Sequence, residues 1–194
     1  INTASNNVAV GWASLSADTK GDKTVAIGRS TLGAQNFTTA TDTYNVAVGY
    51  LAGTSITTGV QNTIVGGLAG DALTDADANV AIGIGALGSD TLGSLSVAVG
   101  ANALNAQNLT TATNTYSVAV GHFAGAAVTT GVENTLIGGL AGDALTVGVR
   151  NVAVGKGALT TDVGGNKSVA IGHSALETQN LGASSTDSNN VAVG

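Results

Sequence analysis

Two histidines, His122 and His173, are the residues of this chain best suited to acid–base or metal chemistry. Neutral imidazole binds metals and titrates near physiological pH. Both residues follow a repeated glycine, at a position that elsewhere holds Trp12, Arg29 or Lys156, and a position that accepts such different side chains is expected to face solvent. The histidines are separated by three coils of the repeat described below, or roughly 14 Å. We therefore predict that they share no site within one chain.

Three carboxylates, Asp71, Asp75 and Asp77, lie close together in the stretch GDALTDADAN. Carboxylate oxygens are typical calcium ligands. However, only Asp71 has a counterpart in the second copy of the repeat, Asp143, and the order D-x-[DN]-x-[DN]-G of a calcium-binding loop is absent. The pattern is more typical of a solvated turn, and we predict no metal site.

No other arrangement of residue types favours catalysis. The glycine pairs Gly66-Gly67 and Gly138-Gly139 are not followed by the lysine of a phosphate-binding loop, and no Ser, His and Asp set is placed by its spacing. A hexapeptide-repeat acyltransferase is the enzymatic alternative, but it requires three anchored hexapeptides per coil and a catalytic histidine, whereas each coil here carries one strong anchor. We predict that the protein is not an enzyme and has no cofactor.

Charge and composition exclude two classes of partner and predict a thin interior. The chain has 6 basic and 12 acidic residues, and the basic ones are scattered, which argues against nucleic acid as a partner. No apolar run approaches the roughly 18 residues that span a bilayer, so we expect no membrane insertion in this segment. Apolar residues make up 43% of the chain but aromatic ones only 3%, and there are 29 Gly with neither Pro nor Cys. Without large rings, such a chain fills only a thin core.

The apolar residues recur in a fixed phrase: a β-branched residue, Ala in most copies, a second β-branched residue and Gly. Successive glycines of the phrase define a period of about 17 residues, and every fourth interval is longer by four or five positions. The glycines are Gly11, Gly28, Gly49, Gly66, Gly83, Gly100, Gly121, Gly138, Gly155, Gly172 and Gly194. One interval corresponds to one coil, so the sequence predicts about 11 coils.

A longer period of about 72 residues lies above the first. Its two complete copies, 29–100 and 101–172, are identical at 44 of 72 aligned positions. We interpret residues 1–194 as a single repetitive segment with these two superrepeats and partial copies at 1–28 and 173–194. Neither end has the atypical sequence of a capping repeat. We therefore expect an internal fragment of a longer fibre protein.

Strands describe the phrase better than a helix does, and the fold class predicted is an all-β parallel β-solenoid. Side chains alternate between the two faces of a strand, so we expect Val118 and Val120 to fill the lumen and Ala119 to lie on a packed outer face. A second strand is expected at the Ala-Leu phrases, as in Ala86-Leu87 and Ala158-Leu159. The residue before each phrase is Asn, Ser or Thr, and we expect these side chains to form hydrogen bonds along the axis.

The phrases Asn79 to Gly83 (NVAIG) and Ser168 to Gly172 (SVAIG) resemble the YadA-like head repeat of trimeric autotransporter adhesins. The longer stretch Thr57 to Leu73 (TTGVQNTIVGGLAGDAL) is similar to repeat regions of bacteriophage tail fibres, especially marine ones. The resemblance implies a left-handed parallel β-roll in which three chains associate along a common axis. It also implies the shaft or head of an extracellular or virion fibre that supports host attachment, or alternatively a bacterial adhesin whose rod wall binds matrix or glycan.

Apolar residues exceed what one thin lumen needs, and we expect the surplus to be buried between three chains. The expected interface is a stripe of the phrase Ala residues and the Leu residues of the Ala-Leu phrases, loosened where Ile64 and Leu136 replace Ala. A cell-surface glycan or protein receptor is expected to bind through adjoining regions.

The insertions at every fourth coil, Gln35–Tyr44, Gln107–Tyr116 and Gln179–Asn190, are expected either to brace a neighbouring chain or to contact a ligand. The candidate surface or interchain contacts are Phe37, Tyr44, Tyr50, Leu109, Tyr116 and His122.

Overall fold

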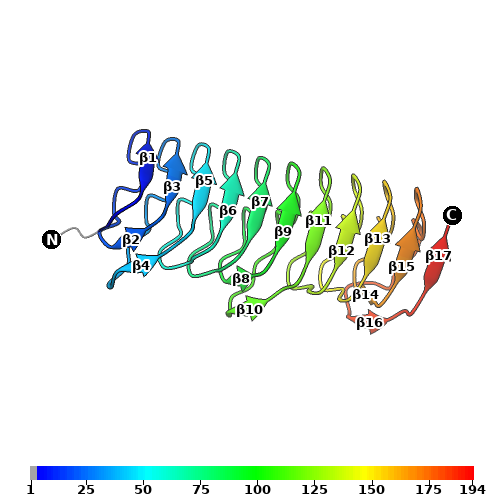
Figure 1. Ribbon diagram of the computed structural model, residues 1–194. Helices are drawn as coiled ribbons and strands as arrows, with labels where there is room; N and C mark the ends of the chain where they lie inside the picture. The colour runs from blue at the N-terminus through cyan, green and yellow to red at the C-terminus, as the bar shows by residue number, and fades with distance from the viewer. Residues whose placement is uncertain (1–3) are drawn as a thin grey trace.

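The chain folds into a parallel β-solenoid. The computed structural model describes residues 4–194, which contain 17 strands and no helix. Eleven strands, one from each coil, form one continuous parallel sheet along the whole rod (Figure 1). They are β1 (Val8–Val10), β3 (Val25–Ile27), β5 (Val46–Val48), β6 (Thr63–Val65), β7 (Val80–Ile82), β9 (Val97–Val99), β11 (Val118–Val120), β12 (Thr135–Ile137), β13 (Val152–Val154), β15 (Val169–Ile171) and β17 (Val191–Val193). The predicted fold class and coil number are confirmed.

The register of the long sheet never slips. Ala81 pairs with Ala98, and Ala98 pairs with Ala119, although four extra residues separate the second pair in the sequence. Each insertion is accommodated outside the long sheet by a small two-stranded parallel ladder. The three ladders join β2 (Gly21–Asp22) to β4 (Thr41–Asp42), β8 (Gly93–Ser94) to β10 (Thr113–Asn114), and β14 (Gly165–Asn166) to β16 (Thr186–Asp187). Insertions therefore alter the wall and leave the stacking of equivalent residues intact.

The middle residue of each long-sheet strand faces the lumen, and the two outer residues face outward. Ala98 and Ala119 are fully buried, whereas Val120 is 36% exposed and Val118 is half-buried. The expectation that Val118 and Val120 fill the lumen is therefore wrong. The alternation holds, but its direction is reversed.

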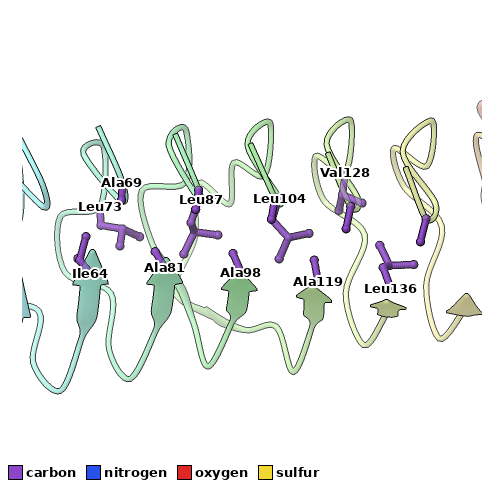
Figure 2. Packing of buried hydrophobic residues seen from close by; sticks show 14 of the residues in the cluster. Ile64, Ala69, Leu73, Ala81, Leu87, Ala98, Leu104, Ala119, Val128 and Leu136 are labelled. Atoms are coloured by element: carbon purple, nitrogen blue, oxygen red, sulfur yellow. The ribbon is translucent and has the colours of Figure 1, made fainter. Parts of the chain in front are cut away.

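The reason for the reversal lies in the turns that face the sheet. Figure 2 shows Leu87 and Leu104 reaching from these turns toward the strands that carry Ala81 and Ala98. Both Leu side chains are fully buried. Because they occupy most of the lumen, only a small side chain fits opposite them, and the strand must turn its Ala inward.

The Ala-Leu phrases form turns, so the second strand expected at Ala86-Leu87 and Ala158-Leu159 is absent. Leu87 and Leu159 adopt the left-handed backbone conformation, with φ of 53° and 55°. This conformation costs free energy for a residue with a Cβ. It recurs at Leu32 and Leu104, with φ of 47° and 48°, and burial of these Leu side chains in the lumen offsets the cost.

Ile64 and Leu136, which replace the phrase Ala, fill the lumen opposite glycines. Gly70 and Gly142 occupy the turn position that Leu87 occupies in its own coil. A Cβ added to Gly142 would lie 2.8 Å from Leu136 Cδ2. The volume lost in the turn is thus restored by the strand residue together with Leu73 and Leu145, whose Cδ1 atoms would lie 2.9 Å from a Cβ added to Gly70 and to Gly142. The expectation that Ile64 and Leu136 loosen an outer interface is wrong, because both are fully buried in the lumen.

The glycine that ends each phrase is required by both conformation and space. Gly100 has a φ of 133°, which residues with side chains rarely adopt, and a Cβ there would lie 2.5 Å from the carbonyl oxygen of Gly121 in the next coil. The structural repeat glycines Gly28, Gly49, Gly66, Gly83, Gly121, Gly138, Gly155 and Gly172 have the same conformation and the same close contact.

The polar residue that precedes each phrase forms the predicted ladder. Asn62 accepts a hydrogen bond at Oδ1 from the backbone N–H of Asn79, at 3.0 Å, and its own N–H donates to Asn45 Oδ1 at 2.9 Å. Asn62 Nδ2 donates to the carbonyl of Ala76, at 2.8 Å. These side chains are fully or almost fully buried. The ladder along the axis is therefore confirmed between the insertions. At the first two insertions the backbone N–H groups of Asn45 and Ser117 donate instead to the hydroxyls of Thr43 and Thr115.

Candidate functional site

The outward face of the long sheet is a continuous apolar surface. Its strands contain no charged residue, and their outward positions hold Val or Ile, except for Thr63 and Thr135. Several of these side chains are large and 36–40% exposed, namely Ile27, Ile82, Val120, Ile137 and Ile171. We call this surface the Val/Ile face. The expectation that the phrase Ala and the Leu of the Ala-Leu phrases form the outer stripe is wrong, because both are buried in the lumen. The exposed apolar stripe consists of Val and Ile.

The residues that follow the phrase glycines face solvent, as their variety predicts. His122 and His173 are exposed, and Trp12 is 69% exposed. Arg29 lies against its neighbours in this column, with its guanidinium carbon 5.1 Å from the Trp12 ring centroid and 5.8 Å from that of Tyr50. Within residues 4–194 no group of three or more His, Cys, Asp or Glu side chains could hold a metal ion.

The carboxylates of Asp71, Asp75 and Asp77 in the GDALTDADAN stretch do not surround a common ligand position. Asp75 accepts a hydrogen bond from the Thr58 hydroxyl at 2.6 Å, and Asp77 accepts one from the backbone N–H of Val60 at 2.8 Å. Both are exposed, whereas Asp71 is half-buried. The solvated turn predicted for Asp75 and Asp77 agrees with this placement, and each carboxylate bonds to the preceding coil.

The candidate contact residues of the insertions divide into two groups. Tyr44 and Tyr116 are 52% and 60% exposed, so they lie on the surface as expected. Phe37 and Leu109 are only 7% exposed, so the expectation of a surface contact is wrong for these two. An apolar side chain in each of the first two insertions instead anchors the loop against the rod. Tyr50 and His122 lie outside the insertions and are exposed.

A buried polar cluster lies beneath each insertion, and sequence reasoning missed it. In the first, Gln35 Nε2 donates to Asp18 Oδ2 at 2.7 Å and to Thr24 Oγ1 at 3.1 Å, and the backbone N–H of Gly21 donates to Asp18 Oδ1 at 2.9 Å. The carboxylate is thus stabilised by amide donors. The signal in the sequence is an Asp followed by a Gln at the same spacing in every superrepeat, as Asp18–Gln35, Asp90–Gln107 and Asp162–Gln179.

Exposed ion pairs join neighbouring coils on the wall. Lys23 Nζ lies 2.5 Å from Asp42 Oδ2, and this hydrogen bond, together with one to the Tyr44 hydroxyl, raises the pKa of Lys23 to about 12. The same ion pair lowers the pKa of Asp42. Lys167 makes the equivalent pair with Asp187 at 2.6 Å. Pairs this exposed contribute little to stability. The second superrepeat has Leu95 and Asn114 at these positions, so the pairs are not needed at every insertion.

Comparisons with known protein families, with characterised proteins and with solved structures found no match to this chain. Among the described residues, no helix is long and apolar enough to cross a membrane. The fold itself therefore defines the class: a parallel β-solenoid repeat protein.

Proposed function

We propose that the chain is part of the shaft or head of an extracellular or virion fibre, of the bacteriophage tail-fibre kind. In this proposal it assembles as a parallel homotrimer and supports attachment to a host or surface. The observation that carries the proposal is the Val/Ile face, which extends over all eleven strands of the long sheet with Thr63 and Thr135 as its polar positions.

The mechanical part of the proposal rests on the register. Every strand of the long sheet is hydrogen-bonded to the equivalent strand one coil away, so strand pairing is not interrupted anywhere along the described part of the rod. Eleven coils at the usual strand spacing make a rod about 50 Å long. Adding repeats lengthens such a rod without changing its cross-section, which is the property that a fibre shaft requires.

The occupant that we assign to the Val/Ile face is another copy of this chain. An apolar surface about 50 Å long exceeds what soluble monomers commonly expose. The face repeats with the spacing of one coil, and a parallel copy presents the same residues with the same spacing along all eleven strands. Closed rotational symmetry buries such faces without open-ended growth. The number three comes from the resemblance of the NVAIG and SVAIG phrases to trimeric adhesin heads.

Light scattering of the purified chain tests the assembly. We expect a mass three times the 18.6 kDa of the chain, and a β-type circular dichroism spectrum. The double variant Val120→Asp with Ile137→Asp should keep the spectrum and lower the mass to that of one chain, because it places charges on the Val/Ile face. Thr130→Asp, at an exposed polar position outside the long sheet, is the matched control and should stay trimeric. A folded parent of single-chain mass would overturn the proposal.

A bacterial trimeric adhesin whose rod wall itself binds matrix or glycan is the second candidate. Exposed aromatic side chains on the wall favour it, since Tyr44, Tyr50 and Tyr116 are 50–60% exposed. Aromatic rings with a polar end are frequent in binding surfaces. Binding of the isolated rod to extracellular-matrix proteins or glycans would favour the adhesin, and a rod inert toward both would favour the shaft.

A further inference from the structure

Two recesses interrupt the rod wall at the turns that follow the long-sheet strands. The first has a volume of about 390 Å³ and contains Gly85 and Gly88. The second has a volume of about 290 Å³ and contains Gly157. Gly85 and Gly157 are equivalent positions of the two superrepeats, so the two recesses occupy the same place in each. We call them the Gly85 recess and the Gly157 recess.

The Gly85 recess exists because a side chain is missing from a stacked column. The backbone N–H of Gly85 bonds to Gly67, and that of Asn102 to Ile84, so Leu68, Gly85 and Asn102 occupy equivalent positions in three successive coils. Leu68 has a φ of 56° and Gly85 a φ of 63°. The backbone is therefore the same with Leu or with Gly, and the glycine leaves room for the Asn102 side chain, whose Oδ1 would lie 2.6 Å from a Cβ at Gly85.

Polar side chains border the recess next to Gly85 and Gly88. Asn105 Nδ2 donates to the Gly85 carbonyl at 2.8 Å. A Cβ added to Gly85 would lie 2.6 Å from Asn102 Oδ1, and one added to Gly88 would lie 3.5 Å from Asp71 Oδ1. One carboxylate and two amides thus border the same small space.

Asp71 is free to accept hydrogen bonds from a ligand. Its counterpart in the Gly157 recess, Asp143, accepts a hydrogen bond from the Thr160 hydroxyl. Gly88 stands where Thr160 would be, so among the described residues the Asp71 carboxylate has only its own backbone N–H as a donor. Partial burial raises the pKa of Asp71, which reflects a carboxylate that lacks both full hydration and a cationic partner.

We propose that the Gly85 recess binds a neutral saccharide unit of hexose size. Asp71 accepts hydrogen bonds, whereas Asn102 and Ser89 both donate and accept, and vicinal hydroxyls have the same mixed capacity. Leu68 and Ile84, which are 39% and 60% exposed, border the recess and offer an apolar surface to the C–H groups of a pyranose. The volume lies in the range of small-molecule sites, and a single carboxylate is a poor set of ligands for a divalent cation. This site adds to the proposed fibre function and does not depend on trimer formation.

Backbone NMR of the intact chain tests the site, with D-glucose, D-galactose, D-mannose and N-acetyl-D-glucosamine as separate probes. At least one should shift the amide signals around Gly85, Gly88 and Asn102 with a Kd in the millimolar range, as expected for a single sugar unit. D-glucuronate should bind more weakly than D-glucose, because its carboxylate meets Asp71. No shift with any neutral sugar would overturn the proposal, and shifts caused by calcium chloride alone would assign the recess to a cation.

Two variants separate the recess from the rest of the wall. Gly85→Leu restores the side chain found at Leu68, fills the space and should abolish the shifts, whereas Gly157→Leu fills the other recess and should leave them intact. Asp71→Asn keeps the size of the side chain and should weaken binding about tenfold or more, since it removes a charged acceptor. Sugar-induced shifts that persist unchanged in Gly85→Leu and Asp71→Asn would contradict the assignment.

Discussion

Asn45 Nδ2 donates a hydrogen bond to Gln35 Oε1 at 2.9 Å, and this bond completes the buried polar cluster beneath the first insertion. The third insertion has the same contact, from Asn190 to Gln179, at 2.6 Å. The second insertion has a serine in place of the asparagine, and there Gln107 Oε1 is buried without a partner among the described residues. The second insertion therefore lacks a hydrogen bond that an asparagine provides in the first and third.

Ser117→Asn should stabilise the protein. The new amide would reach Gln107 Oε1 as Asn45 reaches Gln35, and we expect the free energy of unfolding to rise by about 1 kcal/mol. Chemical denaturation of parent and variant measures the change. The reverse substitution, Asn45→Ser, is the control and should destabilise, because it leaves Gln35 Oε1 unpaired and removes the bond from Asn45 Nδ2 to the Gly59 carbonyl. Equal stability of Ser117→Asn and the parent would indicate that a buried water already satisfies Gln107.

The direction of the strand alternation predicts opposite outcomes for neighbouring substitutions. Ala119→Asp places a charge in the closed lumen and should cost several kcal/mol, enough to unfold the coils around it. Val120→Asp places the same charge on the Val/Ile face and should leave the β-type circular dichroism spectrum intact. Thermal melts followed by circular dichroism distinguish the two. A Val120→Asp variant that unfolds while Ala119→Asp does not would reverse the assignment of the faces.

Substitutions at Leu136 and Gly142 should have strongly coupled effects on the free energy of unfolding, because the Leu136 side chain occupies space that a side chain at position 142 would also need. Leu136→Ala opens a cavity and should cost about 2–5 kcal/mol, and Gly142→Leu overfills the lumen at a cost of about 1–3 kcal/mol. In the double variant the new Leu occupies the space vacated by the old one, as Leu87 does opposite Ala81. Its loss of stability should therefore be clearly smaller than the sum of the two single losses. Additive losses, measured by denaturation, would mean that the side chains do not share this space.

Gly100→Ala should be far more harmful than Gly67→Ala. Gly100 has a φ of 133°, and a new Cβ would lie 2.5 Å from the Gly121 carbonyl oxygen, so the variant must strain the backbone or separate two coils. We expect a loss of about 2 kcal/mol or more. At Gly67 the nearest atom to a new Cβ is the Tyr50 carbonyl oxygen, at 3.9 Å, and Ala should be tolerated. Similar melting temperatures for the two variants would contradict this account of the repeat glycines.

Much of the fold follows from the sequence alone, because the repeat imposes it. The spacing of the phrase glycines predicts one strand per coil and about 11 coils, and the constant register of the long sheet agrees with it. The hydrogen bonds of Asn62 to Asn45 and Asn79 were also predictable, since a polar residue that recurs with the period of one coil lies next to its own copies. The placement of Gly88 next to Asp71 was not, because it depends on how the turns of successive coils stack.

Only the tertiary structure decided which face of each strand is inside. Alternation in the sequence distinguishes Ala119 from Val118 and Val120, but all three are apolar, so hydrophobicity does not select the inner face. The selection depends on what lies across the lumen, where Leu104 reaches in from a turn and leaves room for only a small side chain opposite. That turn holds Leu104 in a left-handed conformation, with a φ of 48°. Local propensity disfavours this conformation, and stacking of the coils supports it.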